Sequence, residues 1–243
     1  MKNTISLLTL CLFFTINYAN AQDSLAVKIT TKDSINISAT YHLPKIKKAK
    51  IPAIILIHQG GSSREEWYGL SIIDKLLTQG YAVFAYDVRL HGDSDKDEGS
   101  LSDLFNNPNR APNDLQAVIK FLQNDSRIDK NRIGIIGASI GGNLACMASE
   151  NENIKSVVVL SAKTSAAQNL SGKTDPIVPK NAFYIASEEE QKGMRKKWAE
   201  ELYKITLGEK RIEITKGNKH GSYILRDFKD TEDHIIDWIL KTL

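Results

Sequence analysis

Ser139 is the residue whose sequence setting best suits covalent chemistry. Residues 133–142 read IGIIGASIGG, a β-branched run that ends in the pattern G-x-S-x-G. Gly137 and Gly141 flank the serine, as expected where a chain turns from a strand directly into a helix and a Cβ atom would clash. The turn would present the hydroxyl at a helix N-terminus, where the N–H of Ile140 could stabilise an oxyanion. The pattern therefore predicts a nucleophile for acyl transfer, although an ordinary glycine-rich loop would also satisfy it.

A serine that attacks a carbonyl carbon needs a base to accept its proton. His220 is the best candidate, because it lies between Gly217 and Gly221 in a loop that directly follows the strand-like residues 211–215. The alternative for His220 is a turn residue hydrogen-bonded to the backbone. The remaining histidines fit the role of base less well: His42, His58, His91 and His234.

A carboxylate must hold the histidine tautomer and stabilise its imidazolium form. Glu188, Glu189 and Glu190 follow a predicted strand at 181–186, and we favour Glu190 over Asp175, with Glu188 and Glu189 kept as neighbouring alternatives. Asp175 is a rival, but no apolar strand comes directly before it. The three glutamates would also fit an acidic helix start, and Asp175 would also fit a Thr-Asp-Pro turn without any catalytic role.

A second backbone N–H must complete any oxyanion site, and residues 58–62 (HQGGS) follow the first central strand, where such a donor would lie. Two glycines there permit close approach of the backbone to a ligand. The same residues also fit an ordinary loop in which Ser62 or Ser63 caps the next helix, and the two interpretations are compatible.

The elements that would position these groups follow an α/β pattern. Apolar and polar residues alternate at 25–30 and 35–42, which predicts an antiparallel hairpin at a sheet edge. Short apolar runs predict buried strands at 51–58, 81–88, 132–138, 156–162 and 181–186. Helical periodicity appears between and after them, at 65–79, 113–124, 142–150, 189–205 and 231–243. We therefore predict one doubly wound, mostly parallel sheet with helices on both faces.

Two irregular segments, 90–112 and 163–180, follow strands and should lie at the carboxyl edge of the sheet, where open α/β sheets bind ligands. Neither segment is long enough for a separate lid domain, so we expect a minimal lid or none.

Composition limits the partners of the chain. A formal net charge of +3 arises from 32 basic and 29 acidic residues scattered over 243 positions, without a basic block, so we expect no nucleic-acid partner. A content of 42% hydrophobic residues is ordinary for a globular protein, and the length suits a single α/β domain.

Residues 1–21 have the pattern of a signal peptide. Lys2 precedes an apolar run at 5–14, and small residues occupy the expected cleavage positions at 19–21. The run is shorter than the roughly 20 residues that a membrane span requires, so we expect an exported mature domain at 22–243 without a stable membrane anchor. It would be periplasmic or extracellular. Cys146 would be its only cysteine, which excludes an internal disulfide.

Taken together and in this order, four motifs resemble those of the α/β-hydrolase superfamily, especially its small dienelactone-hydrolase-like and esterase-like members. They are residues 58–61 (HQGG), 87–94 (DVRLHGDS), 137–141 (GASIG) and the histidine loop at 217–221. The resemblance covers nearly all of residues 24–243. One departure is Leu90, which stands where the family motif D-x-R-G-H-G-x-S has glycine.

The resemblance implies a role for each candidate residue. Ser139 would be the nucleophile, His220 the general base, and the N–H groups of Gly60 and Ile140 the oxyanion donors. The family's G-x-x-D acid motif falls on residues 187–190 (SEEE), which places Glu190 at the acid position with glutamate in place of aspartate. Dienelactone hydrolases usually carry a cysteine nucleophile, so a serine at 139 points to a carboxylic ester or a related acyl substrate.

The sequence therefore predicts an exported serine hydrolase that cleaves a small to medium acyl substrate through an acyl-enzyme, without a metal or organic cofactor. One alternative is an acyltransferase or peptidase that uses the same triad. Another is a hydrolase-like binding protein without catalytic activity.

Overall fold

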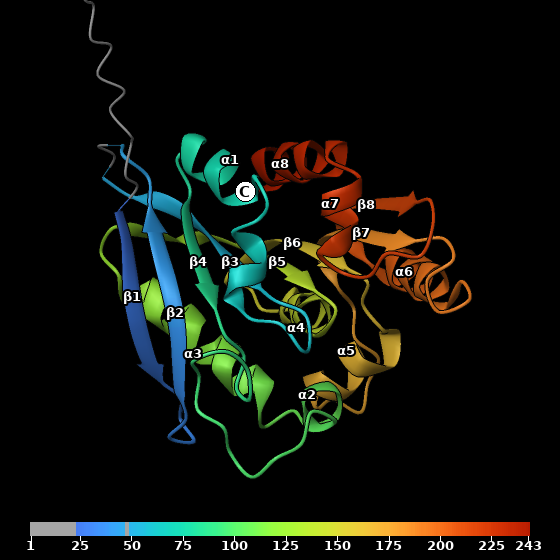
Figure 1. Cartoon of the computed structure of the whole chain (residues 1–243), viewed down its shortest axis with the longest axis horizontal. Helices are drawn as coiled ribbons and strands as arrows, with labels where there is room; N and C mark the ends of the chain where they lie inside the picture. The colour runs from blue at the N-terminus through green and yellow to red at the C-terminus, as the bar shows by residue number, and fades with distance from the viewer. Residues whose placement is uncertain (1–22, 47–48) are drawn as a thin grey trace, which may run out of the picture.

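A computed structural model describes residues 23–46 and 49–243, and the predicted signal peptide at 1–21 lies outside the described residues. Eight strands form one sheet in the order β1-β2-β4-β3-β5-β6-β7-β8 (Figure 1). In chain order these strands are β1 (Asp23–Thr30), β2 (Asn36–Leu43), β3 (Ile51–Ile57), β4 (Ala82–Tyr86), β5 (Ile128–Ala138), β6 (Ile154–Leu160), β7 (Lys180–Ser187) and β8 (Leu207–Thr215).

The N-terminal hairpin forms one edge of the sheet, as predicted. β1 and β2 pair antiparallel from Thr30 opposite Asn36, and β2 continues antiparallel onto β4. The remaining pairs, from β4 through β3 to β8, are parallel. Parallel strands end at the same edge of a sheet, so the loops after β3 to β8 all emerge together.

Helices cover both faces of the sheet, because every residue of β3 and β4 is buried and both faces therefore need apolar cover (Figure 1). One face, which includes Ile55 and Ile57, packs against α3 (Ala111–Asn124), α4 (Ile140–Ala148), α5 (Thr164–Ser171) and α6 (Met194–Ile205). The opposite face, which includes Ile54 and Leu56, packs against the 3-10 helix η1 (Arg64–Trp67), α1 (Ile72–Thr78), α7 (Tyr223–Asp227) and α8 (Asp230–Thr242).

Three predicted helices agree with the structure within two residues at each end, and two differ by more. The helix predicted at 65–79 is divided into η1 and α1, with Gly69, a poor helix former, in the turn between them. The helix predicted at 189–205 begins only at Met194, because positive φ angles at residues 191–193 form a turn there. This turn carries the acidic residues that precede α6.

The two segments predicted to be irregular contain short helices. α2 (Asp103–Asn106) lies within 90–112, and α5 lies within 163–180 and ends at Gly172 in the left-handed conformation. Ala166, Ala167 and Leu170 of α5 are buried, whereas its other positions are polar. Eight residues carry too little apolar periodicity to predict such a helix from sequence.

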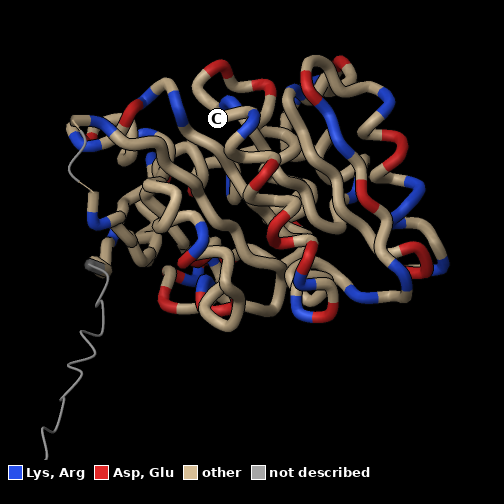
Figure 2. Tube along the Cα trace, turned by 90° about the horizontal axis from the view of Figure 1, so that it is seen from above, with Lys and Arg blue, Asp and Glu red and all other residues tan. Residues whose placement is uncertain are grey.

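Basic and acidic positions are interspersed along the chain, as Figure 2 shows from above. Over residues 23–46 and 49–243, no helix combines the length and the apolar character that a membrane crossing requires. Cys146, in α4, is a buried free thiol, and burial raises its pKa to about 12.

Candidate active site

Ser139 lies in the sharp turn between β5 and α4, as the sequence predicts. Its φ and ψ are 53° and −105°, a conformation that costs free energy in a residue other than glycine. A Cβ atom on Gly137 would overlap the carbonyl of Gly141, and one on Gly141 would overlap the carbonyl of Ile57 in β3. Both flanking glycines are therefore required by the crossing of the backbone. The Ser139 N–H donates to the Leu160 carbonyl at 2.8 Å, which ties the turn to the end of β6.

His220 and Glu190 are brought together at the same edge of the sheet. His220 Nδ1 lies 2.5 Å from Glu190 Oε1, and Glu190 is only 4% exposed. A carboxylate only accepts hydrogen bonds, so Nδ1 carries the proton, and Nε2 of the neutral ring has the lone pair that a general base needs. The His220 side chain is about one-third exposed, at 34%. The pair thus has the arrangement of a base and its orienting acid.

Of the four candidate acids, Glu190 alone makes this contact to His220. Glu188 and Glu189 are exposed, and their backbone N–H groups donate to Thr215 and Gly217 carbonyls. Asp175 is exposed on the segment after α5, where its carbonyl accepts a hydrogen bond from Gln168. The preference for Glu190 over the other three candidates agrees with this geometry.

Two residues that the sequence did not single out hold Glu190 in place. Ser161 Oγ donates to Glu190 Oε2 at 2.8 Å and accepts the Gly221 N–H at 3.0 Å, so one hydroxyl links the acid to the histidine loop. Arg195 Nε lies 3.1 Å from Glu190 Oε1, and its Nη1 donates to the Ser161 carbonyl at 2.6 Å. Burial lowers the pKa of Arg195, while the charge of Glu190 opposes that shift.

The only sequence signal for Ser161 and Arg195 is the place that each occupies relative to a strand or helix. Ser161 directly follows β6, at the same sheet edge as Ser139, and has a φ of 50°. Arg195 lies in the first turn of α6 and is 7% exposed. Buried arginine is rare unless it is paired, so its burial could be explained only once Glu190 was placed beside it.

The histidine loop lies against the serine turn, although 81 positions (220 − 139) separate the two residues. A Cβ atom on Gly221 would stand 3.3 Å from the Ala138 Cβ and would overlap the side-chain oxygen of Gln59. The residue after His220 therefore packs on the residue before Ser139. Both loops also touch the loop that follows β3.

The loop after β3 is fixed by hydrogen bonds on either side of Gly60. The Gln59 N–H donates to Glu66 Oε1 at 3.1 Å, and the Gly61 N–H donates to His91 Nε2 at 3.0 Å. A Cβ atom on Gly60 would lie 2.7 Å from Ile140 Cδ1, so the loop packs directly on the residue after the serine. This packing places Gly60 and Ile140, the two predicted oxyanion donors, side by side. The Ser63 side chain also caps η1, so this loop has the helix-capping role that the sequence offered as the compatible second interpretation.

His58 and His91 brace the loops instead of serving as bases. His58 Nε2 accepts the Val88 N–H at 2.9 Å, and His58 Nδ1 lies 2.7 Å from the Gln59 carbonyl, to which it donates. Burial lowers the pKa of His58 to about 4, so its ring is neutral near pH 7. The ring of His91 lies 5.0 Å from that of His58, centroid to centroid. Together they join the loop after β3 to the loop after β4.

Leu90 stands where the family motif has glycine, and its backbone conformation is strained for a residue with a side chain. Its φ is 71°, in the left-handed region that glycine adopts without strain. The neighbouring Arg89 is 1% exposed and donates to Asp114 from both Nε and Nη2, at 2.9 and 2.7 Å. This buried pair fixes the backbone beside the strained leucine.

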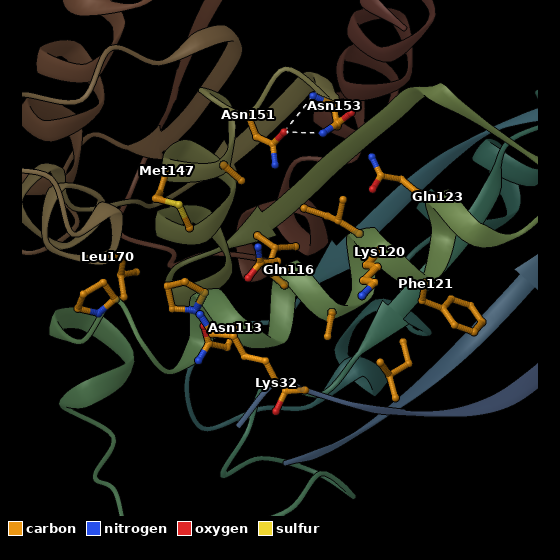
Figure 3. A pocket seen from close by; sticks show the side chains of 18 of the residues that line it. Lys32, Asn113, Gln116, Lys120, Phe121, Gln123, Met147, Asn151, Asn153 and Leu170 are labelled. Atoms are coloured by element: carbon orange, nitrogen blue, oxygen red, sulfur yellow. Dashed lines mark hydrogen bonds between the residues drawn. The ribbon is translucent and has the colours of Figure 1, made fainter. Parts of the chain in front are cut away.

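A large cavity lies away from Ser139, His220 and Glu190 (Figure 3). It has a volume of about 1240 Å³ and runs along α3, near the turn after β1 and the C-terminal ends of α4 and α5. Polar side chains that line it include Lys32, Lys120, Asn113, Gln116 and Gln123. In the part of the chain that the structure describes, no group of three or more His, Cys, Asp or Glu side chains could hold a metal ion.

Known proteins share both the fold and parts of the sequence. The chain is 33% identical over 132 residues to the uncharacterised protein YcjY of Escherichia coli, covering 53% of this chain and 42% of that protein. It spans less than half the length of the curated relatives it matches.

Two solved structures are similar over 91% of the chain. The Pyrococcus furiosus esterase Pf2001 has a TM-score of 0.71 at 20% identity, with 93% of its chain covered. A dienelactone hydrolase from Anabaena variabilis has a TM-score of 0.70 at 18% identity, with 99% covered. The model of the alpha/beta hydrolase fold family matches residues 52–236. The chain therefore belongs to the α/β-hydrolase fold family.

Proposed function

We propose that this protein is a serine hydrolase that cleaves a carboxylic ester, or a related acyl bond, of a small to medium substrate. The observation that carries the proposal is the 2.5 Å contact of His220 Nδ1 with buried Glu190, in a loop packed on the serine turn. The names of two structural neighbours, an esterase and a dienelactone hydrolase, agree with this reaction class.

The reaction would proceed in two steps through an acyl-enzyme. Ser139 Oγ attacks the ester carbonyl while His220 Nε2 takes its proton, and Glu190 stabilises the imidazolium. The N–H groups of Gly60 and Ile140 bind the oxyanion. His220 then gives the proton to the leaving alcohol. A water molecule, deprotonated by His220, attacks the acyl-enzyme, releases the acid and restores the Ser139 hydroxyl.

The partner in this proposal is a small acyl substrate, bound near the loops at 90–112 and 163–180. The proposed mature domain, residues 22–243, would act after export, outside the cytoplasm. Each step uses side chains and backbone N–H groups of the protein together with water, so the proposed mechanism needs no cofactor.

Ester turnover and covalent labelling of Ser139→Ala test the proposal. We expect the purified protein to hydrolyse short p-nitrophenyl esters and to be labelled by a fluorophosphonate, and Ser139→Ala to lose both. Ser24→Ala, on strand β1, serves as the matched serine-to-alanine control. Undiminished turnover or labelling of Ser139→Ala would refute the assignment. An unlabelled, inactive wild-type protein would favour the binding-protein alternative, and transfer to an added alcohol or amine would favour an acyltransferase.

A further inference from the structure

Glu66 is a buried carboxyl group that the proposed mechanism does not use. It lies in η1, directly after the loop of Gly60, and is 7% exposed. Its Oε1 accepts the Gln59 N–H at 3.1 Å. The hydroxyls of Ser62 and Ser222 lie beside the same carboxyl group. Because Ser222 is two positions after His220, Glu66 stands between the loop that carries the oxyanion donor Gly60 and the loop that carries the base.

The cluster around Glu66 contains buried oxygen atoms that lack a hydrogen-bond partner. Glu66 Oε2, Gln59 Oε1 and Ser222 Oγ are all buried, and none makes a well-aligned hydrogen bond to another described residue. The Gln59 side-chain oxygen lies where a Cβ atom on Gly221 would stand. A carboxylate adds only acceptors to such a cluster, whereas a protonated carboxyl group supplies an O–H donor. The Ser222 hydroxyl can donate to only one of the two pure acceptors, Glu66 Oε2 and Gln59 Oε1, and an unpaired buried acceptor costs free energy. A neutral Glu66, which adds one donor, therefore suits this site.

Electrostatics favour the neutral form as well. Burial raises the pKa of Glu66 to about 7, although the hydroxyls of Ser62 and Ser222, the Gln59 N–H and the charge of Arg226 on α7 all oppose the shift. The positive charge of Arg226 therefore offsets only part of the cost of burying an ionised carboxylate. Near neutral pH the neutral and ionised forms are both populated.

We infer that Glu66 is a positioning residue of the hydrolase: in its neutral form its carboxyl group joins the loop of Gly60 to the loop of His220 and holds both for catalysis. This inference rests on the proposed function, because the geometry that it protects is that of the oxyanion site and the base. Ionisation would place a charge in the buried cluster and loosen both loops.

A pH profile distinguishes positioning by the neutral carboxyl group from a purely structural role. Glu66→Gln keeps an oxygen to accept the Gln59 N–H and adds an N–H donor that does not titrate. We expect kcat/KM of the wild-type protein to fall as pH rises through about 7, and Glu66→Gln to match it at pH 6 but lack this descending limb. Glu66→Leu should lower kcat by about 10²-fold with KM little changed, because the oxyanion forms only in the transition state.

Thermal stability measures the same titration without catalysis. An acid whose pKa is raised from 4.5 to about 7 on folding loses its stabilising effect as pH rises between those values. We therefore expect the Tm of the wild-type protein to fall relative to Glu66→Gln from pH 4.5 to 7 and to stay parallel to it above. Glu65→Gln, at the exposed neighbouring position, should follow the wild type.

Parallel Tm curves for wild type and Glu66→Gln over this range, or an unchanged descending limb in Glu66→Gln, would overturn the inference. So would a kcat of folded Glu66→Leu equal to that of wild type. If the wild-type protein hydrolyses no ester and takes no fluorophosphonate label, the proposed function fails, and the Tm comparison still decides whether Glu66 titrates in the buried cluster.

Discussion

At the scale of single residues, the site depends on neighbours that sequence patterns do not reveal. The turns that carry Ser139 and His220 could be predicted, because the glycines beside these residues are required by the local backbone conformation. Among residues 188–190 the choice was harder, since three consecutive glutamates have equivalent chemistry. Tertiary contacts separate them: Glu190 turns inward to His220, Ser161 and Arg195, whereas Glu188 and Glu189 remain exposed.

The assignment of the acid can be tested by removing one carboxylate at a time. Glu190→Gln should lower kcat by about 10³- to 10⁴-fold, because an amide can stabilise neither the reactive tautomer nor the imidazolium form of His220. Glu189→Gln should keep the wild-type kcat, since its side chain lies in solvent. Steady-state kinetics on a p-nitrophenyl ester provide the measurement. A larger loss in Glu189→Gln than in Glu190→Gln would show that the acid is misassigned.

At the scale of elements, strands were easier to predict than helices. The buried strands were predicted within a few residues, because their apolar runs are nearly continuous and their ends coincide with turn residues. The short helices α2 and α5 escaped prediction, since four and eight residues contain little periodicity. The break between η1 and α1 escaped it too, because the apolar pattern continues across Gly69.

The crossing of the serine turn over β3 explains why position 141 must be glycine. Gly141→Ala should destabilise the fold by about 3 kcal/mol, because its methyl group would collide with the Ile57 carbonyl, and neither backbone can move freely. Gly69→Ala is the matched control, since a Cβ atom there meets nothing within 4 Å. It should be neutral or stabilising by about 0.4–1 kcal/mol. Urea unfolding of both variants gives these values, and a Gly141→Ala variant as stable as wild type would contradict the packing argument.

At the scale of the whole molecule, the general architecture could be predicted from the alternation of strands and helices. Parallel topology then brings Ser139, Glu190 and His220 to one edge of the sheet, although they are distant in sequence. Buried contacts between loops could not be predicted in the same way. Glu66 shows why: nothing in its local sequence reveals that its carboxyl group is buried beside Ser222, 156 positions (222 − 66) further along.

Export is a prediction that concerns the whole chain. Expression of residues 1–243 in a secreting bacterial host should yield a mature protein that begins at Gln22, with the mass of residues 1–21 missing. Intact-protein mass spectrometry of the periplasmic and culture fractions measures this. Ala21→Arg should block processing, because the cleavage position requires a small residue. A full-length protein confined to the cytoplasm would contradict the prediction.

The manner in which Glu190 is anchored bears on how this protein could diversify. Its partners come from the end of β6, the first turn of α6 and the histidine loop, so Ser161, Arg195 and His220 all lie outside the proposed substrate-binding segments at 90–112 and 163–180. Selection could therefore remodel these two segments, and with them the range of acyl groups that the proposed enzyme accepts, while the side-chain contacts of Glu190 stay intact. Such modularity would let one ancestral scaffold give rise to descendants that catalyse the same reaction on different substrates.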